Sequence, residues 1–276
     1  MASLDTAGIR DITPGEFAQF KRLIFDIAGI TLTEAKQVLL AGRLFKRVKH
    51  FGFGSYSDYY RHVSQPAHQD ELQVMVDLLT TNETYFFREA QHFEFLKHCA
   101  QQHTGGTFRV WSAAASSGEE AYSIAMVLAD TMASGAWEVV GTDISTRVLD
   151  KARNGHYSME RTQGIPDRFL KQHCLKGIGE HAGTLLIRRA LRERVRFVHG
   201  NLLQPRRDLG SFDVIFLRNV MIYFEMDTKR KVVANLIPFL KPGGRLIVGH
   251  SESLNGITDR LAAVQPTIYA RGGDRT

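Results

Sequence analysis

The stretch RVWSAAASSGEE, from Arg109 to Glu120, places small side chains and two carboxylates where a ligand could bind. Arg109–Trp111 are typical of the end of a buried strand, and Glu119 and Glu120 open a helical segment. In open α/β sheets, a strand that turns through small residues into a helix directs backbone N–H groups at a bound ligand. We therefore expect a ligand site here; an ordinary loop packed with small residues is the alternative interpretation.

The composition of this loop limits the class of ligand. Gly118 is the only glycine between Ser112 and Glu120, so the glycine fingerprint of dinucleotide sites is absent. A P-loop would require a Gly-Lys-Ser/Thr ending, which is also absent. A carboxylate at the turn instead suits a ligand with an amine, such as the methionine part of S-adenosylmethionine. Either Glu119 or Glu120 could make that contact.

Further polar residues follow the other apolar runs. Asp143 ends the next run, about 20 residues past the loop, where an acidic side chain accepts hydrogen bonds from ribose hydroxyls. A simple aspartate at a helix N-terminus is the alternative. Asn219 and Tyr223 follow the run FDVIFL, and Asn201 and Leu202 in HGNLL are suited to an adenine pocket. Because the carboxyl ends of parallel strands meet at one edge of a sheet, these residues together predict a site for an adenosine-bearing cofactor.

Alternating strands and helices must position these residues. From residue 107 onwards the pattern predicts a parallel α/β sheet. The expected strands are TFRVW, WEVVGTDI, FDVIFLRN and RLIVGH, and PTIYARG is suited to an edge strand. The helices expected between them cover residues 119–133, 145–155 and 228–240.

Residues of about 168–199 interrupt this alternation. Glycines separate the short segments KQHCLKG, TLLIRRA and VRFVHG, which we interpret as a small antiparallel insertion. Basic residues greatly outnumber acidic ones here. An arginine-rich edge strand suits the capture of an extended acidic peptide by strand addition. Protection of the edge by charge is the alternative.

Residues 12–80 predict a separate helical domain. Thr13, followed by a proline and Glu16, is a good helix N-cap. A second predicted helix, LTEAKQVLLAGRLFKRVKHFG, is capped by Thr33 and collects cations on one face: Lys36, Arg43, Lys46, Arg47 and His50. This face is either a docking surface for an acidic helix or an ordinary solvated face. The segment TTNETYFFREAQHFEFL, residues 80–96, is a candidate lid or linker over the ligand site.

The composition is that of an ordinary globular protein. Of 276 residues, 43% are hydrophobic and 23% are charged, which allows one large domain or two of about 150 residues. The net charge of +6 suits an acidic partner, but it does not choose among a nucleic acid, a membrane surface and an acidic protein. Two distant cysteines, Cys99 and Cys174, favour neither a disulfide framework nor a zinc site. No apolar run approaches about 20 residues and no secretory signal is visible, so we expect a cytoplasmic protein without membrane insertion.

Six motifs in order carry a resemblance to one family. They are TTNETYFFRE, WSAAASSGEEAYSIA, GTDIS, NLL, FLRNVMIYF and LKPGGRLIVGHSE. Over nearly the whole chain, the sequence closely resembles the chemotaxis receptor methyltransferases (CheR-type), which methyl-esterify glutamates on bacterial chemoreceptors. The resemblance implies an all-α N-terminal domain with a linker at 1–85 and a Rossmann-like class I methyltransferase domain at 86–276. A small antiparallel β-subdomain is expected to be inserted in the latter at about 168–199.

The resemblance also implies roles for individual residues. Arg88 and Tyr223 are the pair expected nearest to the transferred methyl group. The basic face of the second helix is expected to meet the acidic methylation helices of the receptor through Lys36, Arg43, Lys46 and Arg47. The residues expected to contact S-adenosylmethionine, with S-adenosylhomocysteine as the product, are Asn82, Thr84, Arg88, Glu119 (preferred over Glu120), Asp143, Asn201, Leu202, Asn219 and Val220. No metal ion is expected.

Partners follow from the same resemblance. We expect a monomer that is recruited to chemoreceptor clusters and does not bind nucleic acid. In some members of the family, the β-subdomain tethers a pentapeptide at the receptor C-terminus. A regulatory protein is a further candidate partner.

Two other functions compete with this interpretation. A methyltransferase acting on nucleic acid would suit the net charge, but base-directed amino methylation usually brings an Asn/Asp-Pro-Pro-aromatic run where this chain has RNVMIY. A cofactor-binding adaptor without catalysis is the second alternative. The presence of Arg88, Asp143 and Tyr223 argues against it.

Overall fold

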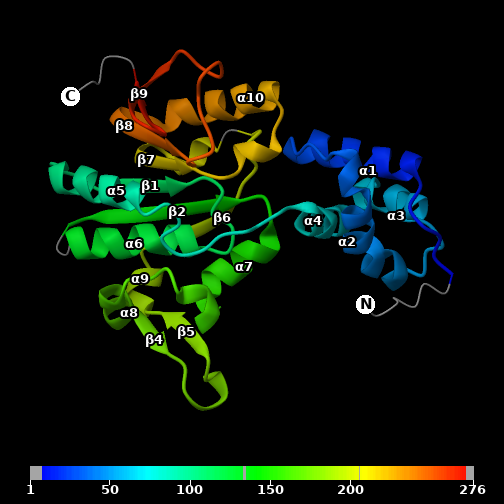
Figure 1. Cartoon of the computed structure of the whole chain (residues 1–276), viewed down its shortest axis with the longest axis horizontal. Helices are drawn as coiled ribbons and strands as arrows, with labels where there is room; N and C mark the ends of the chain where they lie inside the picture. The colour runs from blue at the N-terminus through cyan, green and yellow to red at the C-terminus, as the bar shows by residue number, and fades with distance from the viewer. Residues whose placement is uncertain (1–7, 133–134, 205, 272–276) are drawn as a thin grey trace. The chain divides into compact units, whose positions relative to one another are not determined.

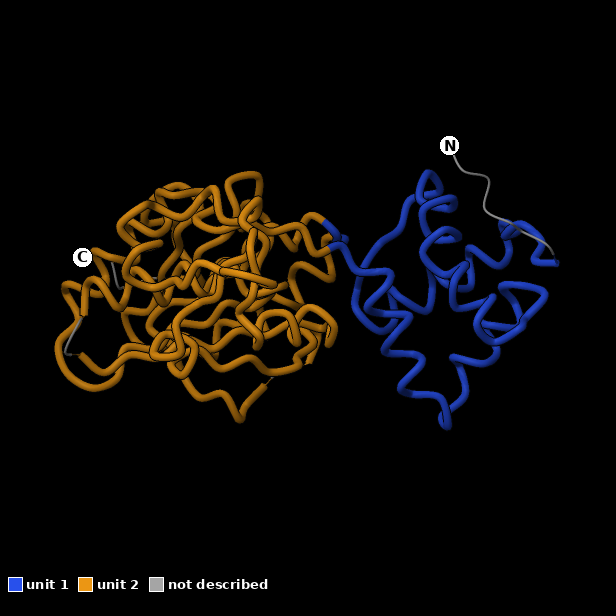
Figure 2. The backbone as a smooth tube through the Cα atoms, turned by 90° about the horizontal axis from the view of Figure 1, so that it is seen from below, with its two compact units in different colours: residues 1–81, 223–225 blue, residues 82–222, 226–276 orange. Residues whose placement is uncertain are grey.

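The computed structural model describes residues 8–132, 135–204 and 206–271, which divide into two compact units. Unit 1 contains the residues up to Thr81 together with Tyr223–Glu225. Unit 2 contains Asn82–Ile222 and the residues from Met226 onwards (Figure 2). Among the described residues, no helix is both long enough and apolar enough to span a membrane.

Unit 1 is helical. Its elements are α1 (Pro14–Ala28), η1 (Glu34–Lys36), α2 (Gln37–His50), α3 (Tyr56–Val63), η2 (Pro66–His68) and α4 (Gln69–Leu79) (Figure 1). An isolated antiparallel bridge joins Ile30 to Phe224, so a short segment from far along the chain completes the unit. The predicted all-α N-terminal region is confirmed.

The start of α1 follows directly from its sequence. Thr13 accepts a hydrogen bond from the Glu16 N–H, and the Glu16 side chain accepts one from the Thr13 N–H, which completes a capping box. Such caps stabilise a helix by about 1 kcal/mol. The helix ends at Gly29, whose φ of 72° places it in the left-handed region that glycine adopts without strain. The apolar face predicted for α1 is buried at Phe17, Phe20 and Ile24.

The start of the second helix differs from the prediction. Thr33 makes no side-chain capping bond, and the residues after it form the 3₁₀ turn η1. The α-helix α2 begins only at Gln37. At this start the Gln37 side chain donates a hydrogen bond to the Ile12 carbonyl at 3.0 Å, a long-range contact that the local capping pattern does not contain.

Unit 2 is built on a seven-stranded sheet with the order β6-β2-β1-β7-β8-β10-β9. Its strands are β1 (Phe108–Ser112), β2 (Trp137–Asp143), β6 (Val195–His199), β7 (Phe212–Leu217), β8 (Leu240–Val248), β9 (Leu261–Gln265) and β10 (Ile268–Arg271). The five strands from β6 to β8 pair in parallel. Strand β10 pairs antiparallel with β8 on one side and with β9 on the other. The predicted parallel α/β sheet is confirmed.

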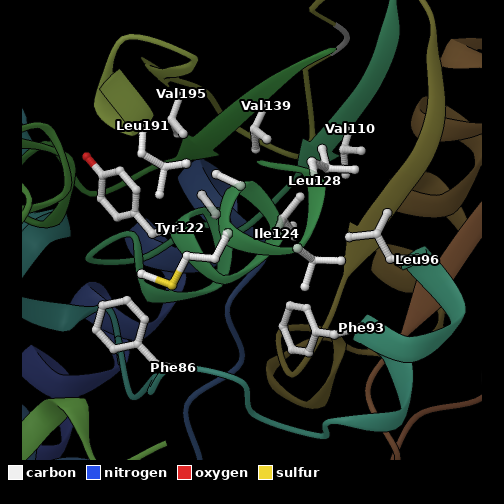
Figure 3. Packing of buried hydrophobic residues seen from close by; sticks show 14 of the residues in the cluster. Phe86, Phe93, Leu96, Val110, Tyr122, Ile124, Leu128, Val139, Leu191 and Val195 are labelled. Atoms are coloured by element: carbon white, nitrogen blue, oxygen red, sulfur yellow. The ribbon is translucent and has the colours of Figure 1, made fainter. Parts of the chain in front are cut away.

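Helices cover this sheet and bury its core. They are α5 (Gln91–Gln102), α6 (Glu119–Thr131), α7 (Thr146–Asn154) and α10 (Met226–Leu236). Figure 3 shows Phe93 and Leu96 from α5 directed towards Ile124 and Leu128 of α6, beside Val110 of β1. This packing fixes α6 against β1, and it therefore fixes the loop between them.

A three-stranded antiparallel sheet is inserted after α7 (Figure 1). It has the order β3-β5-β4, with β3 (His156–Ser158), β4 (Cys174–Lys176) and β5 (Thr184–Ile187). Short helices and turns accompany the two sheets: η3 (Met159–Thr162), α8 (Asp167–His173), η4 (Gly179–His181), α9 (Arg189–Arg192), η5 (Arg207–Leu209), η6 (Met221–Tyr223) and η7 (Ile237–Phe239). The predicted antiparallel insertion is confirmed as an element of the fold.

Two strands were assigned wrongly from the sequence. The segment VRFVHG was expected in the insertion, but it forms β6, which pairs in parallel with β2. As an edge strand, β6 buries Val195 and Phe197 and exposes Arg196, so it alternates like a strand of an antiparallel sheet. The segment PTIYARG was expected at an edge, but β10 lies between β8 and β9. The edge strand is β9, whose Val264 is exposed.

Candidate functional site

The carboxyl ends of the parallel strands β1, β2, β6 and β7 meet at one edge of the large sheet. Most of the predicted cofactor residues lie at the ends of these strands or in the segments that follow them: Glu119, Asp143, Asn201, Leu202, Asn219 and Val220. The remaining predicted cofactor residues, Asn82, Thr84 and Arg88, come from the segment before α5.

The loop after β1 is joined to Asp143 at the end of β2. The Ser116 N–H donates to one carboxylate oxygen at 2.8 Å, and the Ser145 N–H donates to the other at 2.9 Å. Asp143 is buried, so these bonds fix its carboxylate at the edge of the sheet. Asp143 thus belongs to the loop structure as well as to the predicted site.

Gly118 allows this loop to turn into α6. Its φ is 96°, a conformation that favours glycine. A Cβ there would lie only 2.8 Å from the Cβ of Ala152 and 3.0 Å from the Tyr157 hydroxyl. The single glycine of the loop is therefore required by backbone geometry and by the close approach of α7.

Glu119, the first residue of α6, is fully buried beneath Arg161. Arg161 donates to the same carboxylate oxygen through Nε at 2.9 Å and Nη2 at 2.6 Å. The hydroxyl of Ser117 donates to the other oxygen at 2.7 Å. Arg161 comes from η3, and its side chain remains 45% exposed, so the partner of Glu119 can move into solvent.

Glu120 has a different and more enclosed partner. Its carboxylate accepts from Nη1 of Arg218 at 3.0 Å and from the Ser112 hydroxyl at 2.7 Å. Burial raises the pKa of Glu120, while the positive charge of Arg218 opposes that rise. The Arg218 side chain is only 1% exposed, so it cannot withdraw from Glu120 as Arg161 can from Glu119.

The segment before α5 lies against the same loops. The carbonyl of Asn82 accepts from the Ser116 hydroxyl at 2.9 Å, and the carbonyl of Thr84 accepts from Arg161 at 3.1 Å. These contacts connect two predicted cofactor residues to the loop that binds Asp143 and to the partner of Glu119. The Arg88 guanidinium donates to the Glu83 carbonyl at 3.3 Å.

Asn201 and Leu202 follow β6, as the prediction of an adenine pocket requires. Both line a pocket that also includes Trp111, Thr142 and Phe239. The Asn201 side chain accepts a hydrogen bond from the Leu203 N–H at 2.9 Å, which fixes the turn. The aromatic side chains of Trp111 and Phe239 in this lining are of the kind that can border an adenine ring.

Asn219 and Val220 follow β7 and are held by Glu252, a residue that sequence reasoning missed. Glu252 accepts from the N–H groups of Asn219 at 2.8 Å, Val220 at 3.1 Å, Met221 at 2.8 Å and Gly249 at 2.7 Å. This carboxylate satisfies the N-terminus of η6. The signal available in the sequence was an acidic residue in GHSE directly after an apolar strand.

The other predicted residues belong to unit 1. The carbonyl of Tyr223 accepts from the Thr31 N–H at 2.9 Å. On α2, Arg43 donates to the carbonyls of Leu79 and Thr80 at 3.0 and 3.3 Å. Arg47 pairs with buried Glu71 at 2.8 and 2.5 Å. Lys36 and Lys46 are exposed.

Sequence reasoning also missed Arg161, Arg218 and Glu89. Arg161 reaches Glu119 from 42 residues away along the chain, a pairing that no local pattern indicates. Arg218 ends the apolar run FDVIFL, and a cation at the end of a buried strand was the available signal. Glu89 joins Arg218 to Asn219, with oxygens 2.9 and 3.1 Å from their nitrogens.

The donor set fits a cofactor that has an amine, two ribose hydroxyls and an adenine ring. Two buried carboxylates are present, Glu119 at the start of α6 and Asp143 at the end of β2, and Trp111 and Phe239 lie in the pocket beside Asn201 and Leu202. The loop between Ser112 and Gly118 has only small side chains. Anionic acceptors and close access to the backbone suit S-adenosylmethionine better than a dinucleotide diphosphate.

Comparison with known proteins agrees with this architecture. Residues 82–270 match the model described as CheR methyltransferase, SAM binding domain, and residues 15–80 match CheR methyltransferase, all-alpha domain. The chain is similar to the chemotaxis protein methyltransferase of Escherichia coli (strain K12), with 40% identity over 266 residues, 95% of this chain and 93% of that protein. It is also similar to the chemotaxis protein methyltransferase of Salmonella typhimurium, with 38% identity over 96% of this chain and 92% of that protein.

A third relative is chemotaxis protein methyltransferase 2 of Pseudomonas aeruginosa, with 37% identity over 94% of this chain and 93% of that protein. The family resemblance inferred from the six motifs is confirmed by these matches, as is the combination of an all-α N-terminal part with a methyltransferase fold. The chain belongs to the CheR family of S-adenosylmethionine-binding methyltransferases.

Proposed function

We propose that this protein transfers methyl groups from S-adenosylmethionine to specific glutamate side chains on the cytoplasmic helices of bacterial chemoreceptors, which gives sensory adaptation in chemotaxis. The relatives named as chemotaxis protein methyltransferases support this substrate class. The observation that carries the proposal is the bond from the Ser116 N–H to Asp143 at 2.8 Å. It joins an acidic side chain at the end of β2, the position from which a carboxylate binds a ribose in such sheets, to the small-residue loop after β1.

The cofactor would be held by residues of unit 2. Glu119 is the better candidate for the amine, because its partner Arg161 is exposed enough to move aside, whereas the partner of Glu120 is enclosed. Asp143 would accept hydrogen bonds from the ribose hydroxyls. Asn201 and Leu202 would border the adenine. The other proposed contacts are Asn82, Thr84, Arg88, Asn219 and Val220.

S-adenosylmethionine supplies an activated methyl group, and S-adenosylhomocysteine is the product. A glutamate carboxylate is already ionised near neutral pH, since its reference pKa is about 4.3. The chain therefore needs no general base, and catalysis depends on positioning and on the exclusion of water. We assign Arg88 to hold the incoming carboxylate and Tyr223 to orient it by a hydrogen bond. Tyr223 belongs to unit 1, and its role rests on the family resemblance.

Receptor recognition is assigned to the basic face of α2. Lys36 and Lys46 are exposed, and so are the neighbouring apolar residues Val38 and Leu39. Arg43 and Arg47 belong to the same face, but they also bind α4. Arg43 donates to the Leu79 carbonyl at the end of α4, and Arg47 pairs with Glu71 in its first turn. An acidic, partly apolar receptor helix would complement this surface.

The remaining assignments follow from the family. We propose that residues 1–85 form the docking domain and linker and that 86–276 form the catalytic domain with its β-subdomain. The β-subdomain is a candidate site for a receptor C-terminal pentapeptide, by strand addition to its short sheet. The protein would act in the cytoplasm as a monomer at receptor clusters.

Transfer of radiolabelled methyl from S-adenosylmethionine to membranes containing chemoreceptors tests the function. Label on the receptor that mild alkali removes would establish a carboxyl methyl ester. Absence of label, despite calorimetric binding of the cofactor, would favour a non-catalytic adaptor. Alkali-stable label on RNA or DNA would favour a nucleic acid methyltransferase instead.

A further inference from the structure

Arg218, directly after β7, is a buried cation that joins the segment containing Arg88 and Glu89 to Glu120 at the start of α6. Its side chain is 1% exposed. Its guanidinium donates to Glu89 from Nη2 at 2.9 Å and to Glu120 from Nη1 at 3.0 Å. Nη2 also donates to the backbone carbonyl of Arg88. Since a planar guanidinium fixes the directions of all its donors, these acceptors are held in one arrangement.

The backbone on both sides of Arg88 adopts an unfavourable conformation. Phe87 has a φ of 55° and Glu89 has a φ of 58°, and neither residue is a glycine. Such residues persist in the left-handed region only where neighbouring contacts hold them. Here the Phe87 N–H donates to the Ser123 hydroxyl at 3.0 Å. Arg218 donates both to the backbone carbonyl of Arg88 and to the Glu89 carboxylate.

Glu89 extends the same arrangement to the segment after β7. The Glu89 oxygen that Arg218 binds also accepts from the His250 N–H at 3.2 Å, and the other oxygen accepts from the Asn219 side chain at 3.1 Å. Asn219 is itself in the left-handed region, with a φ of 56°. One carboxylate therefore connects the segment that contains Arg88 to a proposed cofactor residue.

A metal ion is a competing explanation for this cluster. Ligand atoms of Glu89, His92 and His250 all lie within 4.8 Å of one another. Arg218, however, already places its positive charge on the carboxylate that a metal ion would need. A second positive charge at this position is electrostatically disfavoured.

We infer that Arg218 and Glu89 are positioning residues, which hold the Arg88 segment in the strained backbone conformation needed for methyl transfer. This inference rests on the proposed role of Arg88. It predicts that Glu89 and Arg218 affect turnover through Arg88, without contacting the receptor or the transferred methyl group.

The first test uses Glu89→Gln, which keeps an acceptor for Asn219 but removes the charge that binds Arg218. We expect kcat to fall about tenfold or more, while the KM for the receptor and the Kd for S-adenosylmethionine change less than about threefold. Arg218→Lys keeps the charge but lacks the fork of donors, so it should show the same loss. Glu94→Gln, at an exposed site in α5, is the matched control and should retain normal kcat.

A double-variant cycle separates positioning from a general structural effect. If Glu89 acts through Arg88, Arg88→Ala/Glu89→Gln should be no slower than Arg88→Ala alone, within about twofold. Multiplied losses would overturn the inference, as would normal kcat in both Glu89→Gln and Arg218→Lys. If Glu89→Gln does not fold, Arg218→Lys takes its place in the cycle.

Hydrogen exchange provides a readout that does not depend on activity. Peptides covering residues 83–90 should exchange faster in Glu89→Gln than in the wild-type protein, while peptides from the middle of α6 should not change. Unchanged exchange at 83–90 would overturn the inference even in a protein that transfers no methyl groups. Absence of transfer by the wild-type protein, with faster exchange in the variant, would instead count against the proposed function alone.

Discussion

Arg161 binds Glu119 through two nitrogens, at 2.9 and 2.6 Å, and thereby covers a fully buried carboxylate with a side chain that is 45% exposed. The neighbouring Glu120 is bound by Arg218, which is 1% exposed. Two adjacent glutamates at one helix N-terminus thus pair with arginines that differ greatly in solvent exposure. Only Glu119 can exchange its partner for the amine of a cofactor without the removal of a buried cation.

This difference predicts which glutamate binds the cofactor. Glu119→Gln should weaken binding of S-adenosylmethionine about tenfold or more, because a hydrogen bond to a charged group is worth about 1.5–3 kcal/mol. Glu120→Gln should instead lower thermal stability, because it leaves Arg218 with one fewer anionic partner. Calorimetric binding and thermal unfolding of both variants provide the measurement. Normal binding by Glu119→Gln combined with weak binding by Glu120→Gln would move the contact to Glu120.

Arg88→Ala should affect turnover far more than folding. The guanidinium is half-buried and donates to the Glu83 carbonyl at 3.3 Å, a modest contact whose loss costs little stability. Loss of a charged group that positions the reacting carboxylate should lower kcat about 100-fold. Methyl transfer to receptor membranes, compared with the melting temperature, measures both effects. Turnover near the wild-type value would remove Arg88 from the mechanism.

The exposed lysines Lys36, at the end of η1, and Lys46, in α2, should govern receptor recognition. Lys36→Glu/Lys46→Glu should lower kcat/KM for the receptor about tenfold at low salt, and the difference should shrink as salt screens the charges. Cofactor binding should not change. Lys151→Glu/Lys231→Glu, at exposed sites in unit 2, makes the same change in net charge and serves as the control. Equal losses in both double variants would indicate a general charge effect rather than a docking face.

The pair between Arg47 and Glu71 should contribute to the acid stability of unit 1. Burial raises the pKa of Glu71, but hydrogen bonds from Arg47 and Tyr59 outweigh this effect, so its pKa lies below the ordinary value. A carboxyl group with a lowered pKa in the folded state stabilises the fold above its unfolded pKa, near 4.3. That stability is lost as the pH falls through the lower, folded value.

Arg47→Met tests this pair. The variant should be destabilised by about 2 kcal/mol at neutral pH, because the buried carboxylate loses its cation. Its unfolding free energy should also depend less on pH below about pH 4 than that of the wild-type protein. Calorimetry from neutral to acidic pH provides both quantities. An unchanged pH dependence would show that Glu71 titrates normally in the folded protein.

The elements that the sequence predicted best are those that local patterns determine. The capping box at Thr13 and Glu16 involves residues three apart, and β1 is a short local segment, Phe108–Ser112. The placement of β6 failed because an exposed edge strand of a parallel sheet alternates like an antiparallel strand. In such cases the pairing partner, and not the strand itself, determines the topology.

The candidate site was predictable to a similar extent. Asp143 follows from its position at the end of a predicted strand, and in the structure it is the last residue of β2 and accepts a hydrogen bond from the loop after β1. The cations that bind the two glutamates of α6 were not predictable, because Arg161 and Arg218 lie 42 and 98 residues away along the chain. Pairs this far apart in the chain form only in the assembled fold, so the spacing of residues in the sequence does not indicate them.

The bridge between Ile30 and Phe224 also affects how this protein can be divided or recombined. Phe224 is buried and belongs to unit 1, although it lies more than half of the chain after the helices of that unit. A fragment that stops after Thr81 would therefore lack one of its own interior side chains. A chimaera that exchanges only the N-terminal residues with those of a relative would combine one protein's helices with the other protein's Tyr223–Glu225 segment. Exchange of receptor preference between family members should therefore succeed best when both pieces are moved together.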